Sequence, residues 1–487
     1  MKRRLFGLCF VLVLLCAALA VSALADGATL PPIPTEGDVW DGVTITAPSK
    51  LTQVDGVFYY EISTCAELAY IAQTGGEWLG RNYILTNNLI LNDVVLEWDE
   101  DGNLTNDPAT LHEWTPIGKD YSNSFTGIFD GGGYTISGVY INRPDTNVGL
   151  FGWVESIISN LIIVNSYICG NTNVGGVVGF GSVQNCCFLG LVKGNGEVGG
   201  IIGYNDRNPG TSNCINYGTV IGLSGTGGIA GHSDRFFSNC VNYGSVTGKA
   251  YTGGVIGKLS YDVVSNCVNY GTVTASSYVG GIAGGGSYLD ISITNCFNTA
   301  PVKGESSVGG VLGGYIGSYG ATITNCYNLG TVTGTAATST GAIIGSDGIL
   351  FGKDTITGCY YLNTLGLYGC GNITAATTEP DGFNAESAAD LKKQSTYDGW
   401  DFETVWSISA DKNGGYPYLV ALDPAEIPLT GLSLGTDTLS LGVGDTAYLT
   451  ASAAPTLASL PALTWASDNN AVATVDASGK ITAVGPG

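Results

Sequence analysis

Histidine is almost absent from this sequence, which has only His112 and His232 among its 487 residues. The two lie far apart and no H-E-x-x-H pair exists, so the sequence excludes the histidine-based zinc site of a metallopeptidase. No serine stands in a nucleophile elbow, and neither histidine has a suggestive partner, so no Ser/His/Asp triad is indicated. No motif for a metal or a cofactor is indicated, and we expect neither a metal nor a cofactor.

Basic residues are also scarce, with 18 Lys and Arg against 41 Asp and Glu. Long apolar runs are limited to Leu5–Ala20, which follows Lys2, Arg3 and Arg4 and precedes Ala23-Leu24-Ala25. This pattern predicts a secretory signal peptide, residues 1–25, and no membrane span after it. Its removal leaves 15 basic and 41 acidic residues, a net charge of −26. Such a surface repels nucleic acid and keeps copies of the chain apart, so we expect a monomer that binds no nucleic acid.

One nine-residue stretch recurs along the middle of the chain and reads SNCVNYGTV from Ser265. Its other copies begin at Gln184, Ser212, Ser238, Thr294 and Thr324. A Gly pair, two small apolar residues and another Gly precede most copies, as in Gly253–Gly257. The cysteines step by 26 to 33 residues, which is typical of one solenoid coil.

Stacked coils would arrange Asn and Cys in columns. These positions are Asn213, Asn239, Asn266, Asn295 and Asn325, and Cys214, Cys240, Cys267, Cys296 and Cys326. Stacked Asn amides form hydrogen-bonded ladders. Stacked cysteines stand about 4.8 Å apart with parallel Cβ vectors, which suit a disulfide poorly, so we expect free thiols. Strand alternation groups Val264, Asn266 and Val268 on one face, and leaves open whether Cys267 faces the core.

Three strand-length runs per repeat, separated by Gly and Asn, predict an all-β fold: a right-handed parallel β-helix of 12 to 14 coils, roughly 60 Å long. Short capping helices are expected where Thr64 and Glu67 form a capping box and after Ser387 with Asp390, through Leu391–Gln394. Aromatic residues near the second helix are expected to plug the far end.

A small immunoglobulin-like β-sandwich follows the solenoid. The predicted boundaries are 1–25 for the signal peptide, 26–145 for the lead-in, cap and first coils, 146–375 for the repeats, 376–421 for the C-terminal cap, 422–431 for a linker and 432–487 for the sandwich.

The combined repeat, Gly-Gly-apolar-apolar-Gly with Asn-Cys-apolar-Asn, resembles the GLUG-motif repeats of exported bacterial surface proteins. The flanking segments Cys65–Leu68, Trp114–Gly118, Phe125–Gly133 and Tyr416–Leu419 are similar to those that accompany such arrays. The tail resembles the bacterial immunoglobulin-like group 2 domain. That tail carries Gly442-Val443-Gly444-Asp445, Leu463-Thr464-Trp465, Ala471–Asp476 and Gly479–Ala483, and lacks the last strand, so we expect a truncated domain. Both resemblances imply adhesion or display at a cell surface, and neither brings a catalytic residue.

Two other kinds of site compete with simple display. Tyr217, Tyr243 and Tyr270 share one repeat position. If their side chains point outward, they form an aromatic strip that suits sugar rings or a partner strand; if they point inward, they belong to the core. The acidic loop Asp99–Asn103 has the residue types of a calcium site but lacks EF-hand spacing, which favours a solvated loop.

A polysaccharide lyase or glycoside hydrolase is the enzyme alternative, since carboxylates on neighbouring coils suffice for hydrolysis. Its candidate residues are Asp206, Asp234, Asp262 and Asp290.

Taken together, the sequence favours a non-enzymatic, secreted or cell-surface protein, adhesin-like, whose rigid rod binds glycans or surface proteins. A spacer without a ligand is the third hypothesis.

Overall fold

The computed structural model describes residues 30–54, 56–260, 263–287, 291–316, 321–346, 355–371, 381–423, 431–434, 441–448, 451–454, 465–476 and 479–486. The predicted signal peptide and most of the predicted linker lie outside these residues, as do Asp262 and Asp290.

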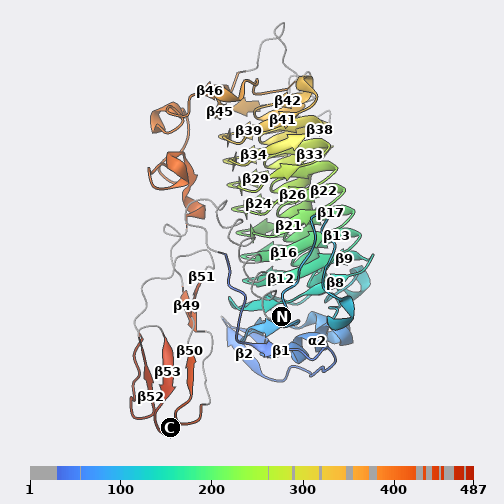
Figure 1. Cartoon of the computed structure of the whole chain (residues 1–487), viewed down its shortest axis with the longest axis vertical. Coiled ribbons are helices and arrows are strands. Elements are labelled where there is room, and N and C mark those ends of the chain that lie inside the picture. Colours follow the sequence, from blue (N-terminus) through green and yellow to red (C-terminus); the bar gives the residue numbers. More distant parts are fainter. Residues whose placement is uncertain are drawn as a thin grey trace, which may run out of the picture.

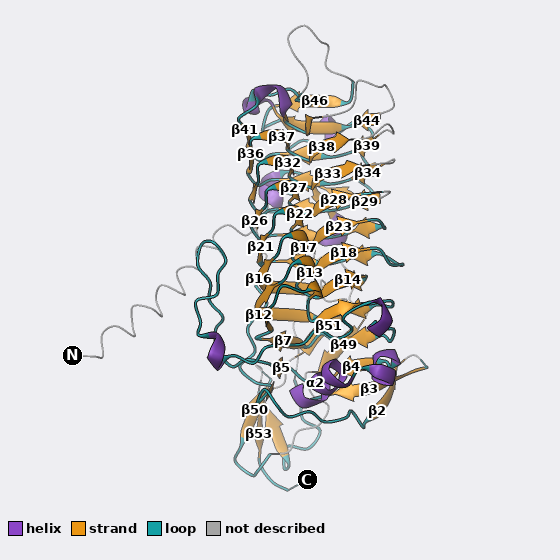
Figure 2. Cartoon of the chain, turned by 90° about the vertical axis from the view of Figure 1, so that its right-hand side faces the viewer, coloured by secondary structure: helices purple, strands orange, loops and turns teal. Residues whose placement is uncertain are grey.

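A parallel β-helix forms the body of the described chain, as predicted (Figure 1). One coil passes through four sheets, which we name S1 to S4 in chain order. In the coil around residue 260 these strands are β27 (Ala250–Gly253) in S1, β28 (Ile256–Leu259) in S2, β29 (Val263–Ser265) in S3, and both β30 (Val268–Asn269) and β31 (Val273–Thr274) in S4. Each pairs in parallel with its equivalents above and below, so the coils lie in register (Figure 2).

S1 and S2 each contain eight strands. Those of S1 are β9 (Thr146–Val148), β13 (Thr172–Gly175), β17 (Gly196–Gly199), β22 (Ser224–Gly227), β27, β32 (Ser277–Gly280), β37 (Ser306–Gly309) and β42 (Thr340–Gly341). Those of S2 are β10 (Phe151–Trp153), β14 (Val178–Gly181), β18 (Ile202–Asn205), β23 (Ala230–Ser233), β28, β33 (Ala283–Ser287), β38 (Leu312–Ile316) and β43 (Ile344–Ser346).

The expectation of three strands per coil is wrong, because the Gly-pair element contributes to two sheets. The chain turns between S1 and S2 at pairs such as Gly253 and Gly254. A Cβ on Gly253 would lie 2.0 Å from the Ile256 carbonyl oxygen, and one on Gly254 would lie 2.2 Å from Asn269 Cγ. Glycine is therefore required at this corner because a Cβ has no space there.

The coil count is also lower than the 12 to 14 that the sequence predicted. S3 has 12 strands, of which β2 (Leu51–Val54) is antiparallel to β3 (Val57–Ile62), so 11 are stacked in parallel. At about 4.8 Å per coil the body is roughly 50 Å long. Residues 92–112 do not continue the β-helix; they form a loop whose Leu96 packs on the outside of S4 against Tyr140 and Tyr167.

The Asn-Cys element turns the corner between S3 and S4. Asn266 and its equivalents adopt left-handed backbone angles, with φ of 53° to 55°. This turn resets the strand alternation, so that Val264 and Cys267 both lie in the central core, while Val268 belongs to a separate outer cluster. The structure thereby answers the question that periodicity left open, since the thiols face inward.

Asparagine side chains follow both sides of this corner. On the outside, Nδ2 of Asn239 donates to Oδ1 of Asn213 at 3.1 Å, and Asn266 and Asn295 continue the column at 3.1 and 3.3 Å. Asn325 shares their left-handed conformation. An inner column, fully buried, runs through Asn216, Asn242, Asn269, Asn298 and Asn328, with amide distances of 2.7 to 2.8 Å. Each inner side chain also hydrogen-bonds to the backbone of the residue two positions later, which is a glycine except after Asn298. Its Nδ2 donates to the carbonyl and its Oδ1 accepts from the N–H, so buried backbone groups are satisfied as well.

All eleven cysteines in the described residues are free thiols, and ten of them are buried. Burial raises the pKa of Cys240, Cys296 and Cys326 well above the ordinary value. A thiolate in this column would lack water and a counter-ion, so these groups stay protonated and unreactive.

Of the two predicted capping helices, the structure contains the first and has a turn in place of the second. As predicted, a capping box of Thr64 and Glu67 begins the helix α2 (Cys65–Thr74), which buries Leu68 and Ile71 against the first coils. Near the C-terminus the predicted helix over Leu391–Gln394 is instead a turn, followed by the 3₁₀ helix η7 (Gln394–Thr396). Ser387 still caps that turn through Asp390.

The aromatic segment around Trp400 was expected to plug the far end, but it lies along the side of the column (Figure 1). Trp400, Trp406 and Leu419 pack on the outer face of S4, over Val268 and Tyr327. The apolar outward positions of S4 require this cover.

The C-terminal part forms small antiparallel sheets. β49 (Gly431–Leu434) pairs with β51 (Ala451–Ala454), and β53 (Lys480–Ala483) lies between β50 (Thr446–Tyr448) and β52 (Ala473–Val475). These pairings agree with the predicted sandwich.

Replacing a buried amide in the inner column will destabilise the fold. Asn242→Ala removes two buried side-chain hydrogen bonds. The Nδ2 group of Asn216 loses an acceptor and the Oδ1 atom of Asn269 loses a donor. Each unsatisfied buried group costs about 1–3 kcal/mol. We expect a clearly lower urea midpoint for this variant. The control is Asn195→Ala, because Asn195 donates to Asn171 in an exposed ladder; an equal loss in both variants would contradict the role of burial.

The cysteine column predicts a specific pattern of thiol labelling. Native protein treated with Ellman's reagent should release at most the signal of Cys169, the one half-buried cysteine in the described residues. Unfolding in urea without a reductant should then expose all eleven. Rapid labelling of several thiols in the native state, or fewer thiols after unfolding, would disprove this arrangement.

Candidate functional site

One outward column on S2 gathers most of the aromatic and charged chemistry of the rod. The registers of β10, β14, β18, β23 and β28 align Trp153, Phe180, Tyr204, His232 and Lys258. Their rings pack along the axis, with 3.8 Å between the centroids of Trp153 and Phe180 and 4.5 Å between those of Tyr204 and His232. We call this column, with the charged residues of the loops after β10, β18 and β23, the S2 strip.

The charges of the S2 strip are paired across coils. Arg207 contacts Glu155 at 3.0 Å and lies over the Phe180 ring, 5.2 Å from its centroid. Asp206 lies 3.7 Å from Arg207 and 3.6 Å from Arg235. Lys258 reaches across one coil to Glu197, at 2.9 Å, a path left open by Gly225 in the coil between.

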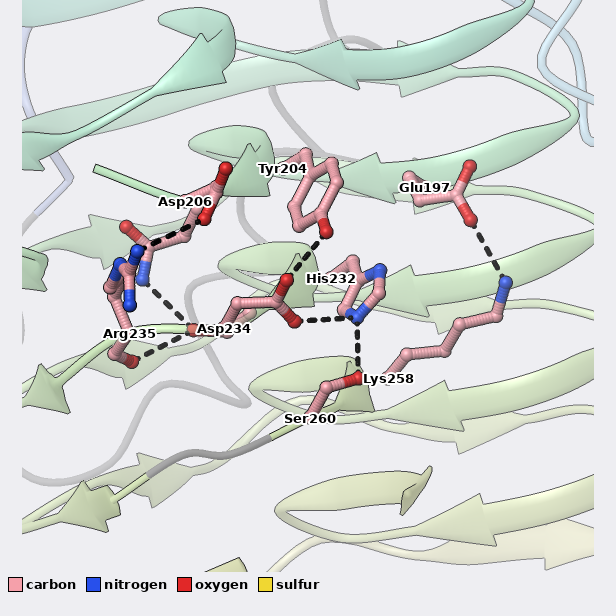
Figure 3. Close-up of polar contacts among 10 residues, drawn as sticks. Glu197, Tyr204, Asp206, His232, Asp234, Arg235, Lys258 and Ser260 are labelled. Carbon is pink, nitrogen blue, oxygen red and sulfur yellow. Dashed lines mark hydrogen bonds and ion pairs between the residues drawn. The ribbon is translucent and has the colours of Figure 1, made fainter. Parts of the chain in front are cut away.

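The centre of the strip is a polar network around His232 (Figure 3). Its Nε2 atom lies 3.0 Å from Ser260 Oγ and 3.1 Å from Asp234 Oδ1, and the Tyr204 hydroxyl donates to Asp234 Oδ2 at 2.6 Å. A catalytic triad needs the carboxylate and the serine on opposite ring nitrogens. Here both share Nε2, so the arrangement does not activate Ser260.

The loop carboxylates do not have the properties of a hydrolase pair. Burial raises the pKa of Asp234, but hydrogen bonds from His232 and Tyr204 outweigh it and hold the net pKa below the ordinary value. Asp206 lies between two guanidinium groups. A general acid needs a raised pKa, so Asp234 is not set up to donate a proton.

The predicted Tyr column lies on the outer face of S4 and is half-buried. The rings of Tyr217, Tyr243 and Tyr270 are stacked at 5.0 and 5.1 Å, with interplanar angles of 4° and 12°. Tyr243 and Tyr270 also pack against the aromatic segment that contains Trp400, Trp406 and Leu419, which we call the C-terminal side segment. Burial raises the pKa of Tyr243 to about 12. Because the rings cover one another's faces, the column presents ring edges, and open faces for sugar stacking are not available along it.

The acidic loop at Asp99 is filled by a lysine. Lys193 Nζ donates to the Asp101 carbonyl and to Asn103 Oδ1, both at 2.8 Å. Asp99 itself accepts hydrogen bonds from the loop backbone. An ammonium group thus takes the oxygen ligands that a calcium ion would need. Within the described residues no cluster of three or more His, Cys, Asp or Glu is arranged to hold a metal.

Sequence reasoning missed the S2 strip because its residues differ from coil to coil. They do share one signal, since each follows the closing Gly of a Gly-pair element, as Phe180 follows Gly179 and His232 follows Gly231. That position points outward, since its side chains lie outside the central core cluster and Trp153, Tyr204, His232 and Lys258 are only partly buried.

The comparisons with known proteins concern parts of the chain. Residues 428–487 match the family model "Bacterial Ig-like domain (group 2)", which confirms the C-terminal part of the resemblance. The chain is 33% identical over 124 residues to Halomucin of Haloquadratum walsbyi, and 45% identical over 58 residues to a protein of Evansella cellulosilytica named "Putative Gly-rich membrane protein". These alignments cover 23% and 11% of this chain, and 1% and 7% of those relatives.

One solved structure is also similar, a Bacteroides ovatus protein named "putative immunoglobulin A1 protease", at 20% identity and a TM-score of 0.39. The alignment covers 74% of this chain and 92% of that one. In the described part of the chain, no helix has the length and apolar character that a membrane crossing needs.

The pKa of Asp234 predicts a pH-dependent contribution to stability. A carboxyl whose folded pKa lies below its unfolded value of 3.8 stabilises the fold above that pH, and loses this effect as pH falls through the folded pKa. Asp234→Asn should therefore lower the free energy of unfolding at pH 7 by about 0.5–1 kcal/mol, the range of a partly exposed pair, with a correspondingly lower Tm, and should lower both less at pH 3. Glu305→Gln, an exposed carboxylate elsewhere, serves as the control. The same Tm difference at both pH values would contradict the assigned role.

Proposed function

We propose that this chain is an exported bacterial cell-surface protein, adhesin-like and non-enzymatic, whose rod presents binding surfaces for glycans or surface proteins. The observation that carries the proposal is the S2 strip, a set of varied outward side chains on a uniform backbone. A regular core fixes the positions of the outward residues, while their identity is free to suit a ligand.

Three further observations support it. The group 2 immunoglobulin-like match, and relatives named as a halomucin and a membrane protein, favour a surface protein. The predicted signal peptide favours secretion. The His232 network and the paired loop carboxylates lack the geometry of a hydrolase, which favours binding over cleavage. On a rigid rod many weak contacts add through avidity, and monomeric rods would be displayed singly.

Tyr217, Tyr243 and Tyr270 form a second candidate surface. Their edges and hydroxyl groups border the C-terminal side segment, and would suit a partner that forms hydrogen bonds better than one that stacks on ring faces.

The test is to incubate purified residues 26–487 with panels of host and plant polysaccharides and of surface proteins. Retention on a ligand and the release of new reducing or unsaturated ends are scored together. We expect retention without cleavage. Cleavage would replace the proposal with a polysaccharide-degrading enzyme, and failure to bind any glycan or protein would leave a spacer.

A further inference from the structure

The S2 strip is charge-compensated in a chain that is otherwise strongly acidic. Its cations each face a carboxylate, as Arg207 faces Glu155 and Lys258 faces Glu197. The mature chain carries a net charge of about −26, so an anionic polymer is repelled from the rod as a whole. A cationic ligand would meet an excess of only one carboxylate here, because four carboxylates face three cations. Its charges therefore favour a neutral ligand.

The polar groups of the strip suit a ligand with many hydroxyl groups. A hydroxyl is both a donor and an acceptor, so it pairs equally with carboxylates and with guanidinium groups. Arg235 is the most open of these groups, because 45% of its side chain is exposed and its contact with Asp206 is loose, at 3.6 Å. Asp206 and Arg235 together offer acceptors and donors side by side at the surface (Figure 3).

Tyr121 adds an open aromatic ring at the N-terminal end of the strip. Its ring meets Trp153 edge-on, with centroids 6.0 Å apart, and the residue is 71% exposed. The loop that carries it, η3 (Tyr121–Asn123), is held by Asp120, whose Oδ1 accepts from the backbone of Ser122 and Asn123. Unlike the stacked rings above it, Tyr121 leaves a face available for the C–H groups of a sugar.

We propose that the S2 strip, together with Tyr121 at its N-terminal end, binds a neutral polysaccharide chain that lies along the axis of the rod. The column extends over about five coils, roughly 20 Å at about 4.8 Å per coil, which suits several linked sugar rings better than a single sugar. Tyr121 stacks on one ring, while Arg235 and Asp206 hydrogen-bond to hydroxyl groups farther along. This inference rests on the proposed function and specifies its site and ligand class.

The experiment measures the affinity of residues 26–487 for two neutral polymers, hydroxyethylcellulose and galactomannan, and for two anionic ones, polygalacturonate and hyaluronate. Tyr121→Ala and Arg235→Ala are compared with matched controls outside the strip, Tyr368→Ala and Lys303→Ala, which also replace exposed side chains. All four substitutions are at the surface, and circular dichroism checks that each variant folds.

We expect binding to at least one neutral polymer, weakened about tenfold in each strip variant and unchanged in each control; a tenfold loss corresponds to about 1.4 kcal/mol, which a side chain in direct contact with the ligand can contribute. Binding to neutral polymers that the strip variants leave intact would overturn the site while leaving the proposed function in place. Binding to the anionic polymers alone would overturn the ligand class. Binding to none of the four, or only to surface proteins, would overturn this inference; the protein panel then decides the proposed function separately.

Discussion

Parallel backbone hydrogen bonding between successive coils is the constraint on which the rest of this structure depends. Each coil satisfies its N–H and C=O groups on its neighbours, so every coil must follow the same path and turn the same corners. The corner between S1 and S2 has no room for a side chain, which fixes the Gly pairs. The corner between S3 and S4 needs a left-handed residue, and Asn meets that need while its amide joins the outer ladder.

Because all coils follow the same path, equivalent side chains form columns. These columns differ in how many residue types they can accept. Inward columns must fill the core, and they consist mostly of Val, Ile, Leu and protonated thiols, with aromatic rings such as Phe151, Phe188 and Phe237 among them. The inner Asn column is polar because it satisfies the backbone at the bend of S4. Outward columns meet no such restriction. On S2 that freedom produces a series of unlike residues from Trp153 to Lys258, and it is there that we locate ligand binding.

The outer face of S4 is the exception among the outward surfaces, because much of it is apolar. Two segments cover it at different heights. The loop of residues 92–112 packs on Tyr140, Tyr167 and Leu191, and the C-terminal side segment packs on Val241, Val268 and Phe297. This need for cover explains why the aromatic segment around Trp400 lies beside the column instead of on its end, and why the stacked tyrosines of S4 are half-buried.

The sequence by itself determined the repeat, the β-helix and the columns of Asn and Cys. In a stacked fold the same position of each coil needs the same type of residue, so the repeat is visible in the sequence. It also predicted α2 from its capping box and the immunoglobulin-like tail from its motifs. It could not decide the direction of Cys267, because strand alternation fails where Asn266 takes a positive φ. Nor could it reveal the S2 strip, whose ion pairs and ring contacts join residues that differ in type and are about 25 to 60 positions apart, as Glu197 and Lys258 are. Only the stacking register of the coils brings such residues together.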